Sequence, residues 1–472
     1  MKHPNPTHQP RRTLGRPLRG SRVCAVQAAS PRRRPSKRER GMALVVVMSV
    51  IAVLTIYLSE MMQNNATSFH VAISQRDKLK AEYVARSAQN LTRLLIANEP
   101  QIRKQVGPFY RMLLKRSPPQ LNVWAFSNEL LQPFFSPTLA AEGDTGIDFS
   151  AMRGVTEIEG SVEVIAVPEN AKINVSDALF LRGNQAKESL ALQLFTLMGG
   201  GVVESPYDPL FEQEDADGQF TTRLDVVAAI IDWWDLDQQR TIYDPGAGTI
   251  ASSGSEDDSY SQLRDPYRVK NAPYDSLEEL RLIRGVGDDF WVNFVESDPT
   301  DPRTRKLTVY ASGRVNPNEA PPAVLLARLC SFVPEQPLCS DATQGLAFIS
   351  LFNTARAIVP LALFSRPADF LDFVQGKTDN ESAPYTMLLS YLSPDNPLMQ
   401  WTPLEVPDDI RKDMMNTFIT SAAIFTIQST GRVGNAEVRL SSVVNFDAGW
   451  SPPPPIAGKM PVLGVFHHYR VN

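Results

Sequence analysis

Residues 38–58 read RERGMALVVVMSVIAVLTIYL, and this stretch decides the class of the protein. Its last seventeen residues, from Met42 to Leu58, carry no charge. At a rise of ~1.5 Å per residue, a helix of this length covers about 25 Å of the ~30 Å hydrocarbon core of a bilayer. Ser59 and a snorkelling Glu60 can complete the span. The stretch therefore predicts a membrane-spanning helix near the N-terminus.

Three kinds of N-terminal segment contain such an apolar run. A secretory signal peptide is disfavoured because no site with small residues follows the run, while an ordinary membrane anchor stays open. The third kind is cut before the run, on the cytoplasmic side of the membrane. Arg38-Glu39-Arg40-Gly41 followed by Met42 resembles the site of the prepilin peptidase, in which the glycine gives the protease access to the backbone. This interpretation predicts cleavage between Gly41 and Met42.

The apolar pattern continues beyond the predicted membrane span. Apolar residues recur with a period of about 3.6, while charged residues occupy the other faces. No proline occurs between Met42 and Pro100, which predicts one helix over residues 42–98. A helix of about 55 residues would be on the order of 80 Å long, half in lipid and half packed on a globular head. A soluble amphipathic helix that follows an ordinary anchor is the alternative. The apolar positions beyond the span are Phe69, Ile73, Leu79, Tyr83, Ala88, Leu91 and Leu95.

The net charge of -5 conceals two parts of opposite sign. Residues 1–41 contain twelve Lys and Arg and one acidic residue, which leaves 35 basic and 51 acidic residues in the rest of the chain. A basic N-terminal leader before an acidic body is typical of an N-terminus held in the cytoplasm, with the body on the other side of the membrane. The acidic body disfavours nucleic-acid binding, because phosphate contacts need a basic face. A glycine hairpin at 280–287 is similar to a helix-hairpin-helix, but Asp288 and Asp289 follow it and would repel a phosphate.

Periodicity divides the body into strands and helices. Alternating apolar residues predict strands at 155–167 and 425–445 and a shorter one at 307–311. The first and last strands are too far apart in sequence for a simple meander. Two similar segments, 174–176 and 316–318, each precede a helical block, which suggests a duplicated helical subdomain. Helices are predicted at 186–197, 222–234, 276–283, 323–329 and 346–354.

Six carboxylates gather in two short segments of the body. Three stand where a predicted helix ends, and three lie on a loop that follows Gly254. Carboxylates that converge repel one another unless a cation lies among them, and hard oxygen ligands favour Ca²⁺. No histidine accompanies them, which disfavours zinc; a solvated acidic surface is the alternative. The candidate ligands are Asp232, Asp235, Asp237, Glu256, Asp257 and Asp258.

Catalysis finds little support in the sequence. Only five histidines occur, and the motifs of nucleophilic and metal-dependent hydrolases are absent, which predicts a protein that is not an enzyme. Carboxylate-only chemistry, such as glycoside hydrolysis at the cell surface, is the alternative. Three cysteines occur, of which Cys24 lies in the basic head. Cys330 and Cys339 are near enough in sequence to close a small disulfide loop in an oxidising compartment, with two free thiols as the alternative.

The body contains a series of short motifs in a definite order: 171–175 (AKINV), 231–237 (IDWWDLD), 255–260 (SEDDSY), 265–267 (DPY), 271–274 (NAPY), 277–286 (LEELRLIRGV), 313–321 (GRVNPNEAP), 425–431 (FTIQSTG) and 438–444 (VRLSSVV). Together with the N-terminal helix they resemble the K class of minor pseudopilins of type II secretion (general secretion pathway protein K). The resemblance covers roughly residues 38–447.

This resemblance implies an α+β fold, in which a pilin-like long N-terminal helix packs on an antiparallel sheet and a large α-helical (SAM-like) domain is inserted. It implies a non-catalytic subunit that binds Ca²⁺ in its helical region. The implied location is the inner membrane, crossed once, with the C-terminal head in the periplasm. The implied partners are the I- and J-class minor pseudopilins, other pseudopilins and the prepilin peptidase, which would cleave after Gly41 and leave Met42 methylated. A minor pilin of an adhesion or DNA-uptake pilus is the alternative.

A position in the membrane segment bears on where such a subunit would sit. Pilins that stack along a filament carry Glu at the fifth mature residue, where the N-terminal amine of a neighbour pairs with it. Val46 stands at that position here, as in the K class. A subunit without the acid needs no neighbour above it, so the resemblance implies a place at the tip of the pseudopilus.

The expected organisation follows from these patterns. The 41-residue leader is long for the K class, and the stretch from 100 to 150 has no counterpart in it. We expect a leader (1–41), the N-terminal helix (42–98), a connection with the first strands (99–175), a first helical subdomain (176–306), a strand with a second helical subdomain (307–415), a closing hairpin (416–447) and a Pro-rich tail that leaves the domain (448–472).

Overall fold

The computed structural model describes most of the chain after residue 36. The described residues are 37–114, 118–135, 160–176, 184–202, 204–212, 214, 220–263, 265–358, 362–378, 384–392, 396, 400–447 and 463–471. The basic leader up to residue 36, with Cys24, lies outside them, as do residues 155–159 of the first predicted strand. The chain divides into two compact units, Met1–Val71 and Ala72–Asn472.

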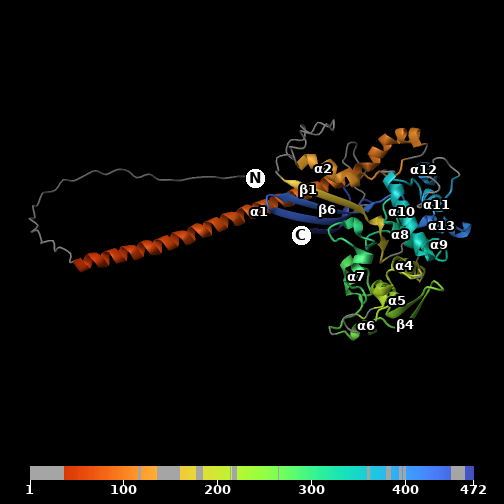
Figure 1. The fold of residues 1–472 in the computed structure, drawn as a ribbon, viewed down its shortest axis with the longest axis horizontal. Coiled ribbons are helices and arrows are strands. Elements are labelled where there is room, and N and C mark those ends of the chain that lie inside the picture. Colours follow the sequence, from red (N-terminus) through yellow and green to blue (C-terminus); the bar gives the residue numbers. More distant parts are fainter. Residues whose placement is uncertain are drawn as a thin grey trace, which may run out of the picture. The chain divides into compact units, whose positions relative to one another are not determined.

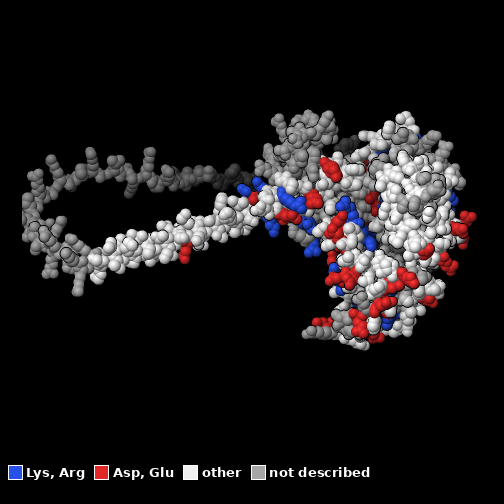
Figure 2. Space-filling view, in the orientation of Figure 1, with Lys and Arg blue, Asp and Glu red and all other residues white. Residues whose placement is uncertain are grey.

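Helix α1 (Lys37–Leu114) contributes to both units. In the first unit its large apolar side chains from Met42 to Met62 are exposed, and Figure 2 shows few charged residues on this stretch. By length and composition, α1 is the one described helix able to span a membrane, with a mean hydropathy of 2.5 over a window in which no residue is buried. α1 is therefore a candidate single-pass anchor. Gly41 and Met42, the predicted cleavage site, lie within it.

Helix α1 extends beyond its expected end at residue 98. It continues through Pro100 and Pro108 and ends at Leu114. A proline inside a helix removes one backbone hydrogen bond and crowds the preceding turn. Tertiary contacts hold this turn: Glu99 is buried, and its carboxylate accepts a hydrogen bond from the Leu121 N–H at 2.8 Å. The helix therefore includes the first part of the stretch that was expected to be a connection.

The sheet of the second unit has four antiparallel strands in the order β1-β6-β7-β8. Figure 1 labels the neighbouring strands β1 and β6. They are β1 (Ser161–Pro168), β6 (Ile424–Val433), β7 (Ala436–Asn445) and β8 (Val465–Val471). The hairpin of β6 and β7 is the predicted closing hairpin. The expectation that the C-terminal tail leaves the domain is wrong for residues 465–471, which pair with β7. Proline explains the error: the run Pro452–Pro455 suggested an extended exit, but it ends ten residues before the alternating apolar residues of β8 begin.

Small residues bring α1 close to this sheet. Ala81, Ala85 and Ala88 are fully buried in a core that they share with apolar residues of β1, β6 and β7. Gly431 of β6 faces them, and a Cβ atom built on it would lie 2.2 Å from the Ala81 carbonyl oxygen. The backbone of the helix therefore approaches the strand as closely as glycine permits. A short helical turn, η1 (Val123–Phe126), and α2 (Ser127–Phe135) pack beside β1.

A mainly helical region of residues 169–423 is inserted between β1 and β6. It contains η3 (Glu169–Ala171), β2 (Ile173–Asn174), α4 (Asn184–Leu197), η4 (Asp208–Phe211), α5 (Arg223–Trp234), β3 (Gln239–Asp244), β4 (Thr249–Ser255), α6 (Asp258–Ser261), η5 (Leu277–Leu282), α7 (Asp288–Phe290), η6 (Trp291–Val295), η7 (Pro302–Thr304), β5 (Leu307–Thr308), α8 (Pro322–Cys330), α9 (Pro337–Ser340), α10 (Ala342–Ile358), α11 (Pro367–Val374), α12 (Pro384–Tyr391) and α13 (Asp408–Asn416). The α+β fold class, with a long N-terminal helix, an antiparallel sheet and an inserted helical region, is confirmed.

The predicted inner elements differ in detail. The helices predicted at 186–197, 222–234, 323–329 and 346–354 correspond to α4, α5, α8 and α10, whereas the segment at 276–283 forms the 3-10 helix η5. The strand predicted at 307–311 is reduced to the two residues of β5, which pairs in parallel with β2. The sulfur atoms of Cys330 and Cys339 are bonded, at the end of α8 and within α9.

The two similar segments adopt the same turn. The side-chain oxygen of Asn174 accepts the Ser176 N–H at 2.9 Å, and that of Asn316 accepts the Asn318 N–H at 3.0 Å. Asn side chains commonly make this bond to the backbone two residues on. The duplication of the helical subdomain stays a prediction, since the shared turn concerns only these short segments.

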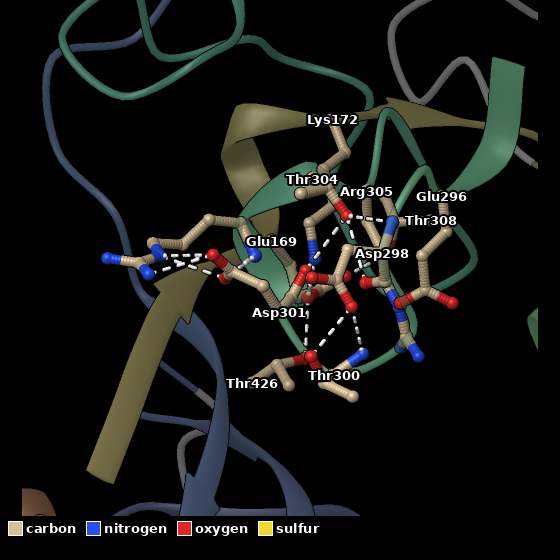
Figure 3. A network of polar contacts seen from close by, with 11 residues as sticks. Glu169, Lys172, Glu296, Asp298, Thr300, Asp301, Thr304, Arg305, Thr308 and Thr426 are labelled. Atoms are coloured by element: carbon tan, nitrogen blue, oxygen red, sulfur yellow. Dashed lines mark hydrogen bonds and ion pairs between the residues drawn. The ribbon is translucent and has the colours of Figure 1, made fainter. Parts of the chain in front are cut away.

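A buried ion pair fastens the inserted region to the sheet (Figure 3). Lys172 and Glu169 lie where β1 ends and are 1% and 2% exposed, with 2.5 Å between Nζ and Oε1. The Glu169 carboxylate also accepts hydrogen bonds from the hydroxyls of Thr426 in β6, at 2.6 Å, and Thr308 in β5. Burial alone would raise the pKa of Glu169, but the Lys172 ammonium and the two hydroxyls outweigh it and lower that pKa. The carboxylate is therefore ionised and fully matched within the protein.

Candidate metal centre

The sequence sets the position of α5, which carries the first carboxylates. Thr222 and Asp225 form a capping box at its start, and its apolar side chains, including Val226 and Ile230, are buried in the core of the inserted region. The helix ends at Trp234, and the Asp235 N–H closes its last turn with a bond of 3.1 Å to the Ile231 carbonyl. Asp232 thus lies in the last turn of the helix and Asp235 at its C-terminal cap.

The hairpin of β3 and β4 brings a third carboxylate to this place. Its strands are antiparallel, with Gln239 opposite Ser255, so Glu256 returns to the point where the hairpin began. The carboxylate of Asp232 accepts the Thr241 N–H at 2.9 Å and so ties β3 to the end of α5. Chain connectivity therefore places Glu256 beside the helix end.

Three of the six predicted ligands converge. Asp232, Asp235 and Glu256 each offer a carboxylate oxygen, these oxygens lie within 4.8 Å of one another, and the residues are 5%, 3% and 4% exposed. The other three do not join them. Asp237 accepts the Gln239 N–H at 2.9 Å, Asp257 accepts the Val269 N–H at 3.0 Å, and Asp258 begins α6.

Burial and like charge dominate the electrostatics of this acidic cluster, which consists of Asp232, Asp235 and Glu256. Burial raises the pKa of Asp232 to about 6. Burial, together with the charges of Asp232, Asp235 and Asp237, raises the pKa of Glu256 to about 8. Without a cation, Glu256 therefore holds a proton at neutral pH.

One basic residue that sequence reasoning missed reaches the edge of the cluster. The ammonium of Lys187, from α4, lies 2.5 Å from Oδ2 of Asp235 and 3.0 Å from Oδ2 of Asp237. Burial raises the pKa of Asp235, and the Lys187 ammonium opposes this rise. Lys187 stands about fifty residues before these partners, and no local pattern in the sequence links them.

Asn271 was also missed as a contributor, although it belongs to the NAPY motif. Its backbone has a φ of +47°, a left-handed conformation that Asn tolerates better than most residues. Its side-chain nitrogen donates to the Asp237 carbonyl at 2.7 Å, and its side chain interacts with Glu256. Within the described chain, its buried Oδ1 atom has no hydrogen-bond partner.

Buried oxygen atoms without a hydrogen-bond partner indicate whether a cation fits in the acidic cluster. Among the described residues, both carboxylate oxygens of Glu256, Oδ1 of Asp235 and Oδ1 of Asn271 are buried without a hydrogen-bond partner. Buried oxygens normally find a donor, and the single proton on Glu256 in the metal-free protein can serve only one of these acceptors; a cation could contact several of them at once. All of them are hard oxygen donors, and neither His nor Cys belongs to the cluster. This donor set fits Ca²⁺ better than zinc or copper.

Comparison with known proteins found similar solved structures but no match by sequence. No protein-family model matches the chain, and no curated protein matches its sequence. The chain is similar to a chain in the crystal structure of the GspK-GspI-GspJ complex from the type 2 secretion system of enterotoxigenic Escherichia coli. The match covers 78% of this chain and 97% of that one, at 13% sequence identity and a TM-score of 0.34. At this TM-score the two chains do not superpose closely over their full length.

Proposed function

We propose that this chain is a membrane-anchored, non-catalytic minor pseudopilin of the K class, which helps to initiate the pseudopilus of a type II secretion system and to export folded proteins. The observation that carries the proposal is the second unit. Its part of α1 packs through Ala81 and Ala85 on a strand at Gly431, and a large helical region interrupts the sheet between β1 and β6. An anchor, a sheet packed on that helix and such an insertion are the features that the sequence motifs imply together.

Membrane processing gives the first test. Mass spectrometry of the protein purified from its own cells should find a mature chain that begins with N-methylated Met42. The variant Gly41→Leu should stay uncut, because a bulky side chain blocks access to the backbone at the scissile bond. Ser59→Leu, beyond the apolar run, is the matched control and should be cut normally. A mature chain that starts near residue 60 would mean a secretory signal and would refute the proposal.

The tip position rests on the membrane segment and on the size of the insertion. Val46 lacks the carboxylate that would pair with a neighbour's amine, and an inserted region of residues 169–423 is hard to repeat along a thin shaft. The purified protein should form a 1:1:1 complex with the I- and J-class minor pseudopilins of the same cells. Immunogold label should appear at one end of the pseudopilus. Label along the whole shaft, or binding only to subunits of an adhesion or DNA-uptake pilus, would favour the alternative function.

We propose in addition that the acidic cluster holds Ca²⁺. The unpaired oxygens of Asp235, Glu256 and Asn271 support this proposal, with Asp232 beside them. Isothermal titration of the chelator-treated protein with CaCl₂ should show a site that Glu256→Gln removes and Asp257→Asn leaves intact. Equal binding by both variants would exclude the cluster.

A further inference from the structure

The two edges of the four-stranded sheet differ in their cover. The edge of β1 is covered by η1 and α2: Trp124 and Leu131 pack into the core, and the side-chain oxygen of Asn128 accepts the Val164 N–H at 3.3 Å. The opposite edge is β8, for which the described strands provide no partner other than β7. An edge strand with free backbone donors and acceptors is a ready template for another strand.

Strand β8 carries exposed apolar side chains, which is unusual for an unpaired edge strand. Val471 pairs with Leu440 and Tyr469 with Ser442, so both lie on the sheet face that packs on α1. Phe466 is held there by the Arg93 guanidinium, 4.2 Å above its ring. Yet Phe466, Tyr469 and Val471 are 39%, 41% and 44% exposed. The strand therefore shows apolar side chains where solvent-facing edges normally carry charges.

Helix α1 also carries exposed apolar side chains in the second unit. Leu79 and Tyr83 are exposed and stand fourteen and ten residues before Arg93, which turns them about 40° and 80° away from it around the axis of α1. We call the following exposed apolar residues the edge surface: Leu79, Tyr83, Phe466, Tyr469 and Val471. An apolar surface of this kind beside an unpaired strand favours association with another chain.

Charge indicates what kind of segment fits. β8 contains His467, His468 and Arg470 and no acidic residue. Figure 2 shows Lys and Arg, with Asp and Glu among them, where α1 meets the rest of the second unit, whereas Asp and Glu predominate around α5 and α6 of the inserted region. Pairing β8 with the β8 of a second copy would bring two Arg470 side chains to one pair of strands without a carboxylate for either, which is unfavourable across strands. An extended segment that carries carboxylates between apolar residues would complement both the basic and the apolar side chains of β8.

We propose that β8 receives an extended, acidic segment of a partner protein as a fifth strand of the sheet, with the apolar side chains of that segment on the edge surface. Main-chain hydrogen bonds would supply affinity, and the carboxylates facing His468 and Arg470 would select the segment. This inference rests on the fold and the charges of the second unit, so it stands apart from the proposed function.

Photo-crosslinking of the full chain in its own cells tests the inference. The crosslinking residue p-benzoylphenylalanine replaces Tyr469 in one strain and Tyr391, on α12 and 67% exposed, in the control strain. Tyr469 should capture a partner polypeptide, and sequencing of the crosslinked peptide should find an acidic segment. Tyr391 should not capture that segment. Val471→Lys, combined with the Tyr469 crosslinker, should lower the yield about tenfold, the change that ~1.4 kcal/mol produces.

A second variant, with the charge of residue 470 reversed, controls for the possibility that Val471→Lys fails to fold. Arg470→Glu keeps the strand but repels an acidic partner, and it should also lower the yield severalfold while leaving the thermal transition of the purified chain in place. The inference is overturned by a crosslink from residue 469 to this chain itself or to a second copy of it. The absence of any crosslink, capture of a segment without acidic residues, or a yield unchanged in both variants would overturn it as well.

Discussion

The buried pair of Glu169 and Lys172 and the acidic cluster of Asp232, Asp235 and Glu256 face the same electrostatic cost in different ways. Around Glu169, the chain supplies an ammonium and two hydroxyls, so every charge has a partner. In the acidic cluster, three carboxylates share one lysine at their edge, and several oxygens have no partner in the described residues. A buried charge needs a counter-charge, and the difference shows where the protein provides one and where it relies on its surroundings.

The largest effect is expected at the buried pair. Lys172→Met leaves the carboxylate of Glu169 buried without its cation, which should lower the free energy of unfolding by about 3–5 kcal/mol. The double variant Lys172→Met with Glu169→Gln removes both charges and should recover much of this loss. Chemical denaturation of the full chain in detergent measures both. A loss below about 1 kcal/mol would mean that water reaches the pair.

Calcium should distinguish the two clusters. A ligand that binds only the folded state at a hundredfold excess over its Kd stabilises that state by about 2.7 kcal/mol. We expect CaCl₂ to raise the melting temperature of the wild-type chain and EGTA to reverse the change. Glu256→Gln should abolish the response, whereas Glu169→Gln should lower the melting temperature and keep the response. A response that survives Glu256→Gln would place the ion elsewhere.

The metal-free protein should lose stability as the pH rises. The pKa of Glu256 is raised from 4.5 to about 8 in the folded state, and that of Asp232 from 3.8 to about 6. A carboxyl group with a raised folded pKa contributes its full stability below the unfolded value and loses it as the pH passes the folded value. Between pH 5 and 8 we expect the free energy of unfolding to decrease in EGTA. Glu256→Gln should flatten this slope, and a rise in stability over the same range would contradict the assignment.

The smallest effect is expected at Lys187. Lys187→Met removes the ammonium that lies beside Asp235 and should destabilise the metal-free chain by roughly 1 kcal/mol, the scale of a single hydrogen-bonded contact. Because Ca²⁺ can offset the lost charge, the stabilisation by calcium should increase. Lys270→Met, which removes an ion pair with Glu279, is the control and should leave the calcium response unchanged. A smaller response in Lys187→Met would show that the lysine supports the ion rather than replacing part of its charge.

Local patterns predicted the elements better than their ends. The uncharged run at 42–58 and the periodicity behind it indicated α1, and Thr222 with Asp225 marks the start of α5. Pro100 suggested a helix end because a local rule cannot include the bond from Leu121 to Glu99. The prediction for the tail is wrong for the same reason: whether residues 465–471 form a strand depends on a free edge at β7, twenty or more residues away along the chain.

The sequence indicated an acidic site, but it did not indicate which residues come together there. Asp232 and Asp235 are three residues apart at a helix end, so a local rule brings them together. Glu256, Lys187 and Asn271 reach them only because a hairpin, another helix and a left-handed turn converge on the same place. Asp257 and Asp258 stand next to Glu256 in sequence, yet neighbours on a turn point in different directions, and the backbone of Val269 takes the Asp257 carboxylate.

The sequence by itself determined the apolar N-terminal helix, the acidic body, the strands of the closing hairpin and the α+β class, because these depend on composition and on periods of a few residues. Only the tertiary structure decided which charges are buried together. Lys172 and Lys187 are both lysines near helix or strand ends, and no local feature separates them. Lys172 meets a single carboxylate, that of Glu169, in a closed site, and Lys187 meets an excess of carboxylates. Burial and pairing are properties of packing between distant segments, and these fix the energy of a charge.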